Sequence, residues 1–206
     1  MKGRKVAYLL AGVLGTLGFW GFYAEPASVR NQSYELTLSN WPNQCDGVRV
    51  ALLADLHVGS PFNGTAKLAR IVDLTQAARP DLILLAGDFV IHGVPGGTFV
   101  PPEEIAARLG RLSAPLGVLA VLGNHDWWFD APRVRKALES AGVPVLEDAA
   151  VAVGAGPCRF WVAGIGTTGR DVTTSSLPSP ACPIPLRFSR SRTTLMSFRI
   201  YPRAST

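Results

Sequence analysis

The chain has 206 residues, enough for one domain of ordinary size but not for a multidomain assembly. Because 48% of the residues are hydrophobic and 17% are charged, the composition excludes a chain that is disordered throughout. A net charge of +5 would suit a nucleic-acid binder, but residues 164–206 alone carry +5 and residues 6–163 carry −3. The positive charge therefore lies at the ends of the chain, and we expect no nucleic-acid partner.

Near the N-terminus, 19 residues without a charge run from Val6 to Ala24. As a helix they would span about 28 Å, close to the hydrocarbon thickness of a bilayer. The basic residues Lys2, Arg4 and Lys5 precede them and favour the cytoplasmic side. A cleaved signal peptide is the alternative, but its apolar region is usually shorter and ends in a small-x-small site. Residues 1–25 are therefore predicted to be an uncleaved, single-pass anchor with a cytoplasmic N-terminus. The domain would then lie on the outer, periplasmic or extracellular side.

Residues 26–47 are predicted to form a linker and an edge strand. From residue 48 to 165, short apolar runs alternate with amphipathic stretches, which is typical of an α/β domain. The strongest strand candidates are the runs Val48–Ala54, Asp81–Ala86 and Gly117–Leu122. Helices are expected to begin near Asn63 or Thr65, at Pro101 and Pro102, and at Asp130. Shorter strands are expected at 143–146, 149–153 and 160–163.

Each of the three strongest strand candidates ends in a polar cluster. The clusters are 33 and 36 residues apart, about one strand-helix-strand unit each. Because parallel strands joined by helices end at the same edge of a sheet, we expect the clusters to converge. Carboxylates, an imidazole and a carboxamide oxygen together suit divalent metal ions. The residues concerned are Asp55, His57, Asp88, Asn124, His125 and Asp126.

Each cluster taken alone has a simpler interpretation as a turn or a helix cap. Three such coincidences, each at the end of a predicted strand, favour the metal site instead. His92 lies four residues after Asp88 and is expected to be an ordinary loop residue. Trp127, Trp128 and Phe129 would suit a substrate-facing or lipid-facing wall, but local packing is the expected role.

Three motifs, Asp55-x-His57, Gly87-Asp88 and Gly123-Asn124-His125-Asp126, resemble in order and spacing the first three motifs of the calcineurin-like metallophosphoesterases. The resemblance covers roughly residues 46–165, and the apolar N-terminus is similar to that of membrane-anchored bacterial members. It implies an α/β/β/α sandwich of the calcineurin-like metallophosphoesterase type, of which this chain holds the N-terminal half behind one transmembrane helix.

The resemblance also implies roles for the six residues. Asp55 and His57 would bind one divalent metal ion, Asp88 would bridge to a second, and Asn124 would bind the second. The ions would be Mn, Fe or Zn. His125 would contact the phosphate and protonate the leaving oxygen, and Asp126 would orient the His125 ring.

The family pattern continues with a further histidine and a Gly-His-x-His motif, neither of which this sequence contains. Its three histidines are His57, His92 and His125. Residues 166–206 are rich in Ser, Thr, Pro and Arg and are predicted to form an irregular basic tail. A truncated or frameshifted chain is one hypothesis for this tail, and a natural flexible tail is the other. The three cysteines, Cys45, Cys158 and Cys182, predict neither a disulfide framework nor a zinc site.

The sequence therefore predicts a metal-dependent phosphoesterase, either a phosphodiesterase or a phosphatase, that uses a metal-activated water. The membrane anchor makes the phosphate of a membrane lipid one candidate substrate. Because the C-terminal histidines are missing, the alternative is a catalytically dead remnant or a binding protein.

Overall fold

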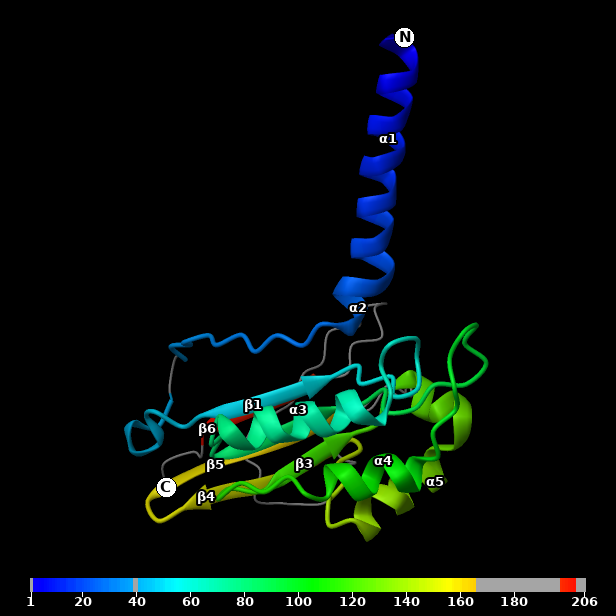
Figure 1. The fold of residues 1–206 in the computed structure, drawn as a ribbon. Coiled ribbons are helices and arrows are strands. Elements are labelled where there is room, and N and C mark those ends of the chain that lie inside the picture. The colour runs from blue at the N-terminus through cyan, green and yellow to red at the C-terminus, as the bar shows by residue number, and fades with distance from the viewer. Residues whose placement is uncertain (1, 39–40, 166–196, 203–206) are drawn as a thin grey trace.

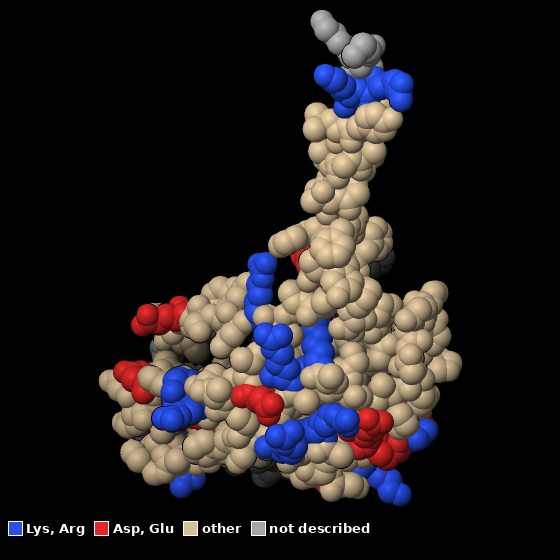
Figure 2. All heavy atoms as spheres, viewed as in Figure 1, with Lys and Arg blue, Asp and Glu red and all other residues tan. Residues whose placement is uncertain are grey.

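The structure, a computed structural model, describes residues 2–38, 41–165 and 197–202. The chain begins with a helical rod that projects from the domain (Figure 1) and contains three successive elements, α1 Lys2–Phe19, the π-helix η1 Trp20–Ala24 and α2 Glu25–Ala27. The stretch Gly3–Ala24 has a mean hydropathy of 1.5, and none of it is buried. Figure 2 shows basic side chains at the free end of the rod and an uncharged surface along it. By length and composition this helix is a candidate membrane span, as the sequence predicts.

The first sheet of the domain is parallel, with the order β1-β2-β3. Helices follow each strand and bury their apolar faces against one side of this sheet, where Leu68, Ile105 and Leu138 are each almost fully buried. The strands are β1 Val50–Ala54, β2 Leu82–Ala86 and β3 Val118–Val121, and the helices are α3 Thr65–Ala77, α4 Pro102–Leu109 and α5 Asn124–Ser140.

The second sheet is antiparallel and covers the opposite side of the first sheet. It contains β4 Ala149–Ala155, β5 Cys158–Ile165 and β6 Ser197–Pro202, in that order. Side chains alternate along β2, so Ile83 and Leu85 face the helices while Leu82 and Leu84 face the second sheet. The layers are thus helix, sheet and sheet (Figure 1), which confirms the predicted α/β class with its parallel sheet.

The three main strands and two of the helices lie close to where the sequence places them. The third predicted helix differs, because α5 begins at Asn124 rather than at Asp130. At Asp130 the helix is interrupted (φ −171°, ψ 84°), and the Asp130 carboxylate accepts a hydrogen bond from the Arg133 N–H. The predicted cap is therefore real, but a first helical segment precedes it. Residues 143–146 form only an isolated bridge, from Val145 to Ala120.

Two predictions about the ends of the domain need correction. The described part of residues 26–47 contains α2 and the 3-10 helix η2 Asn43–Cys45, but no strand. Apolar side chains alternate from Tyr34 to Leu38, yet they are exposed and no described strand lies beside them to supply hydrogen bonds. In the predicted irregular tail, β6 pairs with β5 along its whole length. Its own alternation of apolar and polar residues outweighs the polar composition of the tail around it. The other residues of the predicted tail lie outside the described part.

A disulfide joins Cys45, ahead of β1, to Cys158, the first residue of β5. Both cysteines are buried, and their Cα atoms are 4.8 Å apart. Trp41 strengthens the same junction, because its indole N–H donates to the Cys45 carbonyl and its ring packs 5.2 Å from that of Phe160. The sequence indicates no disulfide framework, yet this single disulfide forms, since an odd number of cysteines still leaves two that can pair.

Candidate metal centre

The loops that follow β1 and β2 run together beyond the ends of these strands. The His57 N–H donates to the Asp88 carbonyl at 2.7 Å, and the Val58 N–H donates to the Phe89 carbonyl at 3.0 Å. These bonds extend the pairing of the parallel sheet past its edge. They hold the first two polar clusters side by side, as the sequence predicts.

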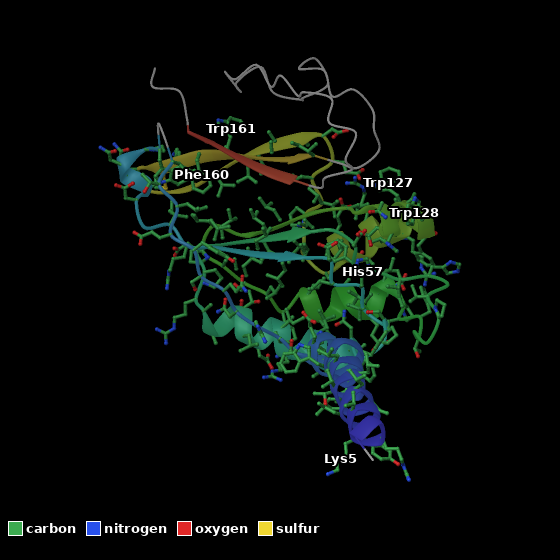
Figure 3. The ribbon with its side chains drawn as sticks, turned by 90° about the horizontal axis from the view of Figure 1, so that it is seen from above. Lys5, His57, Trp127, Trp128, Phe160 and Trp161 are labelled. Carbon is green, nitrogen blue, oxygen red and sulfur yellow. A yellow bond between two sulfur atoms is a disulfide. The ribbon has the colours of Figure 1, made fainter. Side chains whose placement is uncertain are left out.

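The side chains of the three clusters converge at this edge. Nε2 of His57 lies 3.7 Å from Oδ2 of Asp88 and 3.8 Å from Oδ1 of Asp55. One ligand atom from each of His57, Asp88 and His125 lies within 4.8 Å of the others. The rings of His57 and His125 meet edge to face, with their centroids 4.7 Å apart. Figure 3 shows His57 at the end of the sheet nearest to Trp127 and Trp128.

The burial of the two carboxylates differs sharply. The Asp88 residue is 3% exposed, whereas 63% of the Asp55 side chain is exposed. Oδ1 of Asp88 accepts a hydrogen bond from the His125 N–H at 2.9 Å, while Oδ2 stays beyond hydrogen-bond distance of His57. A nearly buried carboxylate needs a compensating partner. This carboxylate and the imidazoles of His57 and His125, whose ligand atoms lie within 4.8 Å of one another, form a donor set that fits a divalent cation.

Gly123 allows the third cluster to approach Asp88. A Cβ at Gly123 would lie 2.1 Å from Oδ1 of Asp88 and 2.4 Å from its backbone nitrogen. Only a residue without a side chain fits this close approach. Asn124 follows directly as the first residue of α5 and is half-buried.

Asp126 is completely buried, and its carboxylate binds backbone groups. Oδ1 accepts from the N–H groups of Phe89 and Val90 at 2.9 and 3.2 Å, and Oδ2 accepts from the Gly123 N–H at 2.8 Å. Burial raises the pKa of Asp126 to about 6, and the three hydrogen bonds oppose this rise. Within the described residues no hydrogen bond joins this carboxylate to the His125 ring. The structure therefore gives Asp126 a different position from the expected one, between the loop after β2 and the start of α5.

Trp128 departs from the expected local packing, because 75% of it is exposed. Its ring lies 4.9 Å from that of His125, which is one helical turn earlier in α5. This spacing of three residues is the sequence signal that points to the contact.

His92 is exposed and contacts Phe129 at a ring distance of 6.1 Å, outside the metal cluster, as expected for a loop residue.

Comparison with known proteins identifies relatives of the domain. The family model for calcineurin-like phosphoesterases matches residues 48–177. The uncharacterized metallophosphoesterase YkuE of Bacillus subtilis and a transmembrane protein with a metallophosphoesterase domain of Danio rerio are 29% and 28% identical over 144 residues, 69% of this chain. The UDP-2,3-diacylglucosamine pyrophosphatase LpxG of Chlamydia trachomatis is 30% identical over 108 residues, 52% of this chain.

The matched regions make up 49%, 31% and 31% of these three relatives, so the chain spans at most about half of their length. The match to the family model nevertheless covers more than half of this chain and includes every strand-end cluster. The chain therefore belongs to the calcineurin-like phosphoesterase family.

Proposed function

We propose that the protein hydrolyses a phosphate ester, as a phosphodiesterase or phosphatase, at the edge where β1, β2 and β3 end. The main support is that ligand atoms of His57, the nearly buried Asp88 and His125 lie within 4.8 Å of one another, with Asp55 3.8 Å from His57. The family membership supports a hydrolase of phosphate esters.

In this proposal Asp55 and His57 hold one divalent ion, Asp88 is shared, and Asn124 holds a second. Mn, Fe and Zn are all compatible with oxygen and imidazole ligands. When bound, such ions supply positive charge to the phosphate and lower the pKa of a water molecule. The protein fixes the ligands in advance, since backbone hydrogen bonds tie the loops of His57 and Asp88 together.

His125 is the proposed general acid. Its backbone N–H is fixed on Asp88, and its ring is half-buried between those of His57 and Trp128. An imidazole in this position can donate a proton to the leaving oxygen of the ester. Asp126 is a positioning residue, because it binds both Gly123 and the backbone after Asp88.

We further propose that the domain lies on the outer side of the membrane. The basic N-terminal end of α1 favours a cytoplasmic N-terminus. The buried disulfide between Cys45 and Cys158 gives independent support, because disulfides persist mainly in oxidising compartments. For the substrate, a membrane lipid is favoured, and one relative is named for a diacylated sugar nucleotide.

The test uses the full chain in detergent. Titration with Mn²⁺ is expected to show binding that Asp88→Asn weakens at least about tenfold, since a nearly buried anionic ligand is lost. Hydrolysis of bis-p-nitrophenyl phosphate should fall by a similar factor or more. Asp73→Asn is the matched control, because Asp73 is an exposed aspartate on α3 and should leave both properties unchanged.

The outcomes separate the two functions considered. Binding with hydrolysis supports the enzyme. Binding without hydrolysis supports the alternative, a binding protein or catalytically dead remnant that keeps part of the centre. Wild-type protein that binds no Mn²⁺ would contradict both.

A further inference from the structure

The membrane helix contacts a loop of the metal centre. The ring of Tyr23 packs edge to face on the ring of Phe62, with 5.0 Å between the centroids. Tyr23 is the penultimate residue of the uncharged run, and aromatic residues near the ends of a membrane span lie at the level of the lipid headgroups. The contact therefore places Phe62 at that level too.

Phe62 belongs to a tight loop that begins at the proposed ligand His57. The hydroxyl of Ser60 donates to the His57 carbonyl at 2.8 Å, and the Gly59 N–H donates to the Asn63 carbonyl at 2.7 Å. The Asn63 side chain also donates to the Leu56 carbonyl. Phe62 itself is 49% exposed, so this rigid loop presents an apolar ring to its surroundings.

A second loop extends beside the first. The Thr98 N–H donates to the Gly59 carbonyl at 2.7 Å, and a Cβ at Gly96 would lie 3.5 Å from the ring of Pro61. This loop follows Asp88 and ends at Phe99, which is 42% exposed. In Figure 1 the loops after β1 and β2 rise toward the end of the domain from which α1 projects. Both loops thus link a proposed metal ligand to the membrane side of the domain.

We propose that residues 59–63 and 93–99, which we call the aromatic lip, rest in the headgroup layer of the bilayer that holds α1. The metal centre would then open at the membrane surface and take the phosphate group of a membrane amphiphile. The assignment to a bilayer follows from the continuity of the lip with Tyr23. Figure 2 supports it, because Lys and Arg side chains gather on the domain surface directly below the helix, where anionic headgroups would attract them. The substrate part of this inference rests on the proposed function, and the position of the lip does not.

The position of the lip is tested without any enzymatic activity. The full chain, carrying Cys182→Ser, is reconstituted into vesicles of phosphatidylcholine and phosphatidylglycerol at three to one. A bimane label is attached at Phe62→Cys or, separately, at Phe99→Cys, which guards against one variant that fails to fold. Ser140→Cys is the control, because Ser140 is exposed at the far end of α5, on the side away from α1 (Figure 1).

Lipids that carry a nitroxide near the headgroup should quench the label at Phe62 and Phe99 and leave the label at Ser140 unchanged. Equal quenching at all three positions, or no quenching at Phe62 and Phe99, would overturn the lip.

The substrate is tested with two phosphodiesters that release the same leaving group, one in a bilayer and one in solution. Wild type and Phe62→Ser are compared on phosphatidyl-p-nitrophenol in vesicles and on soluble bis-p-nitrophenyl phosphate. Phe62→Ser should lower the vesicle rate roughly fivefold or more, because an apolar contact with the bilayer is lost, and leave the soluble rate unchanged. Phe62→Trp should instead hydrolyse the vesicle substrate at the wild-type rate.

An equal loss on both substrates would overturn the role of Phe62 in reaching the membrane, because it would show a defect in the site itself. No activity of the wild type on either substrate would instead count against the proposed function. The quenching result would still decide where the lip lies.

Discussion

Asp55, His57 and Asp88 share a backbone conformation that few residues other than glycine adopt. Their φ angles are 52°, 38° and 53°, all in the left-handed region. Each such residue costs about 1 kcal/mol or more, a strain that must be compensated elsewhere. Here the left-handed turns come at or just after the ends of strands, and the hydrogen bonds between the two loops hold them. Three of the six non-glycine residues with a positive φ in the described part of the chain are therefore residues of the centre.

The closest steric fit of the centre yields a sharp prediction. In Gly123→Ala the new Cβ would collide with Asp88, including its backbone nitrogen, which cannot move away alone. We expect a loss of about 3 kcal/mol in the free energy of unfolding. Binding of Mn²⁺ should fall with it, because Asp88 would be displaced. Thermal unfolding and metal titration in detergent measure the two effects.

Gly64→Ala is the matched control for this substitution. Among the described residues, no atom lies within 4 Å of the Cβ that Gly64→Ala would add. Gly64 also precedes α3, so the cost of the change should stay below about 1 kcal/mol. A Gly123→Ala variant that melts and binds Mn²⁺ like Gly64→Ala would show that the turn can relax.

The part of the site that the sequence predicts consists of residues that follow the end of a strand. His57 and Asp88 follow strands directly, so the topology of parallel strands brings them together. Asp126 has the right residue type, but two of its three backbone partners lie 36 and 37 positions away in the chain, which no local pattern reveals. The exposure of Trp128 depends on which elements cover α5, and this too is a tertiary property.

At the level of elements, α5 consists of two helical segments with different tasks. The first carries His125 and Trp128 at the centre, and the second buries Val134 and Leu138 in the core. The interruption at Asp130 lets the two segments point in different directions. The core can therefore hold the second segment while the first follows the geometry of the site.

Asp130 caps the second segment, so its removal should weaken the helix rather than the centre. Asp130→Ala is expected to cost about 1 kcal/mol, or about 2–4 °C in melting temperature for a chain of this size. Asp130→Ser, which keeps a cap, should restore most of the loss. Affinity for Mn²⁺ should not change in either variant. If Asp130→Ala weakens Mn²⁺ binding as well, the two segments are not independent.

An ion pair between Arg133 and Glu103 connects α5 with α4. The guanidinium donates to both carboxylate oxygens, at 2.8 and 2.9 Å, and this bond lowers the pKa of Glu103. A lowered pKa means that the stabilisation is present above the ordinary Glu pKa of about 4.3 and is lost as the pH falls through the folded-state value. The melting temperature of Glu103→Gln should therefore be lower than that of the wild type at pH 7. The two melting temperatures should converge in more acidic solution.

Glu35→Gln serves as the control for charge alone, because Glu35 is exposed in the segment between α2 and η2. Its melting temperature should match that of the wild type both at pH 7 and in more acidic solution. A difference between Glu103→Gln and wild type that persists unchanged below pH 3 would show that the ion pair is not its cause.

For the whole molecule, the parallel sheet and its helices could be predicted because their signals are local. Apolar runs, helix caps and prolines mark each unit from β1 to α5. The second sheet was harder, since β5 and β6 are separated by 31 residues and pair only through tertiary structure. The disulfide shows the same limit, because Cys45 and Cys158 are 113 residues apart. Spacing along the chain carries no information about such a contact.

This disulfide links the stability of the domain to the side of the membrane on which it folds. It fastens the segment ahead of β1 to the second sheet, and in the chain-entropy account a loop of this length stabilises the fold by about 5 kcal/mol. Cys45→Ser, Cys158→Ser and the double variant should therefore lose similar stability, and the wild type should lose it in reductant.

In cells, acid-trapped and denatured protein should yield one thiol per chain to alkylation, that of Cys182, if the domain is exported. Three alkylated thiols would place the domain in the cytoplasm and contradict the proposed orientation, because a cytosolic pool would keep the pair reduced.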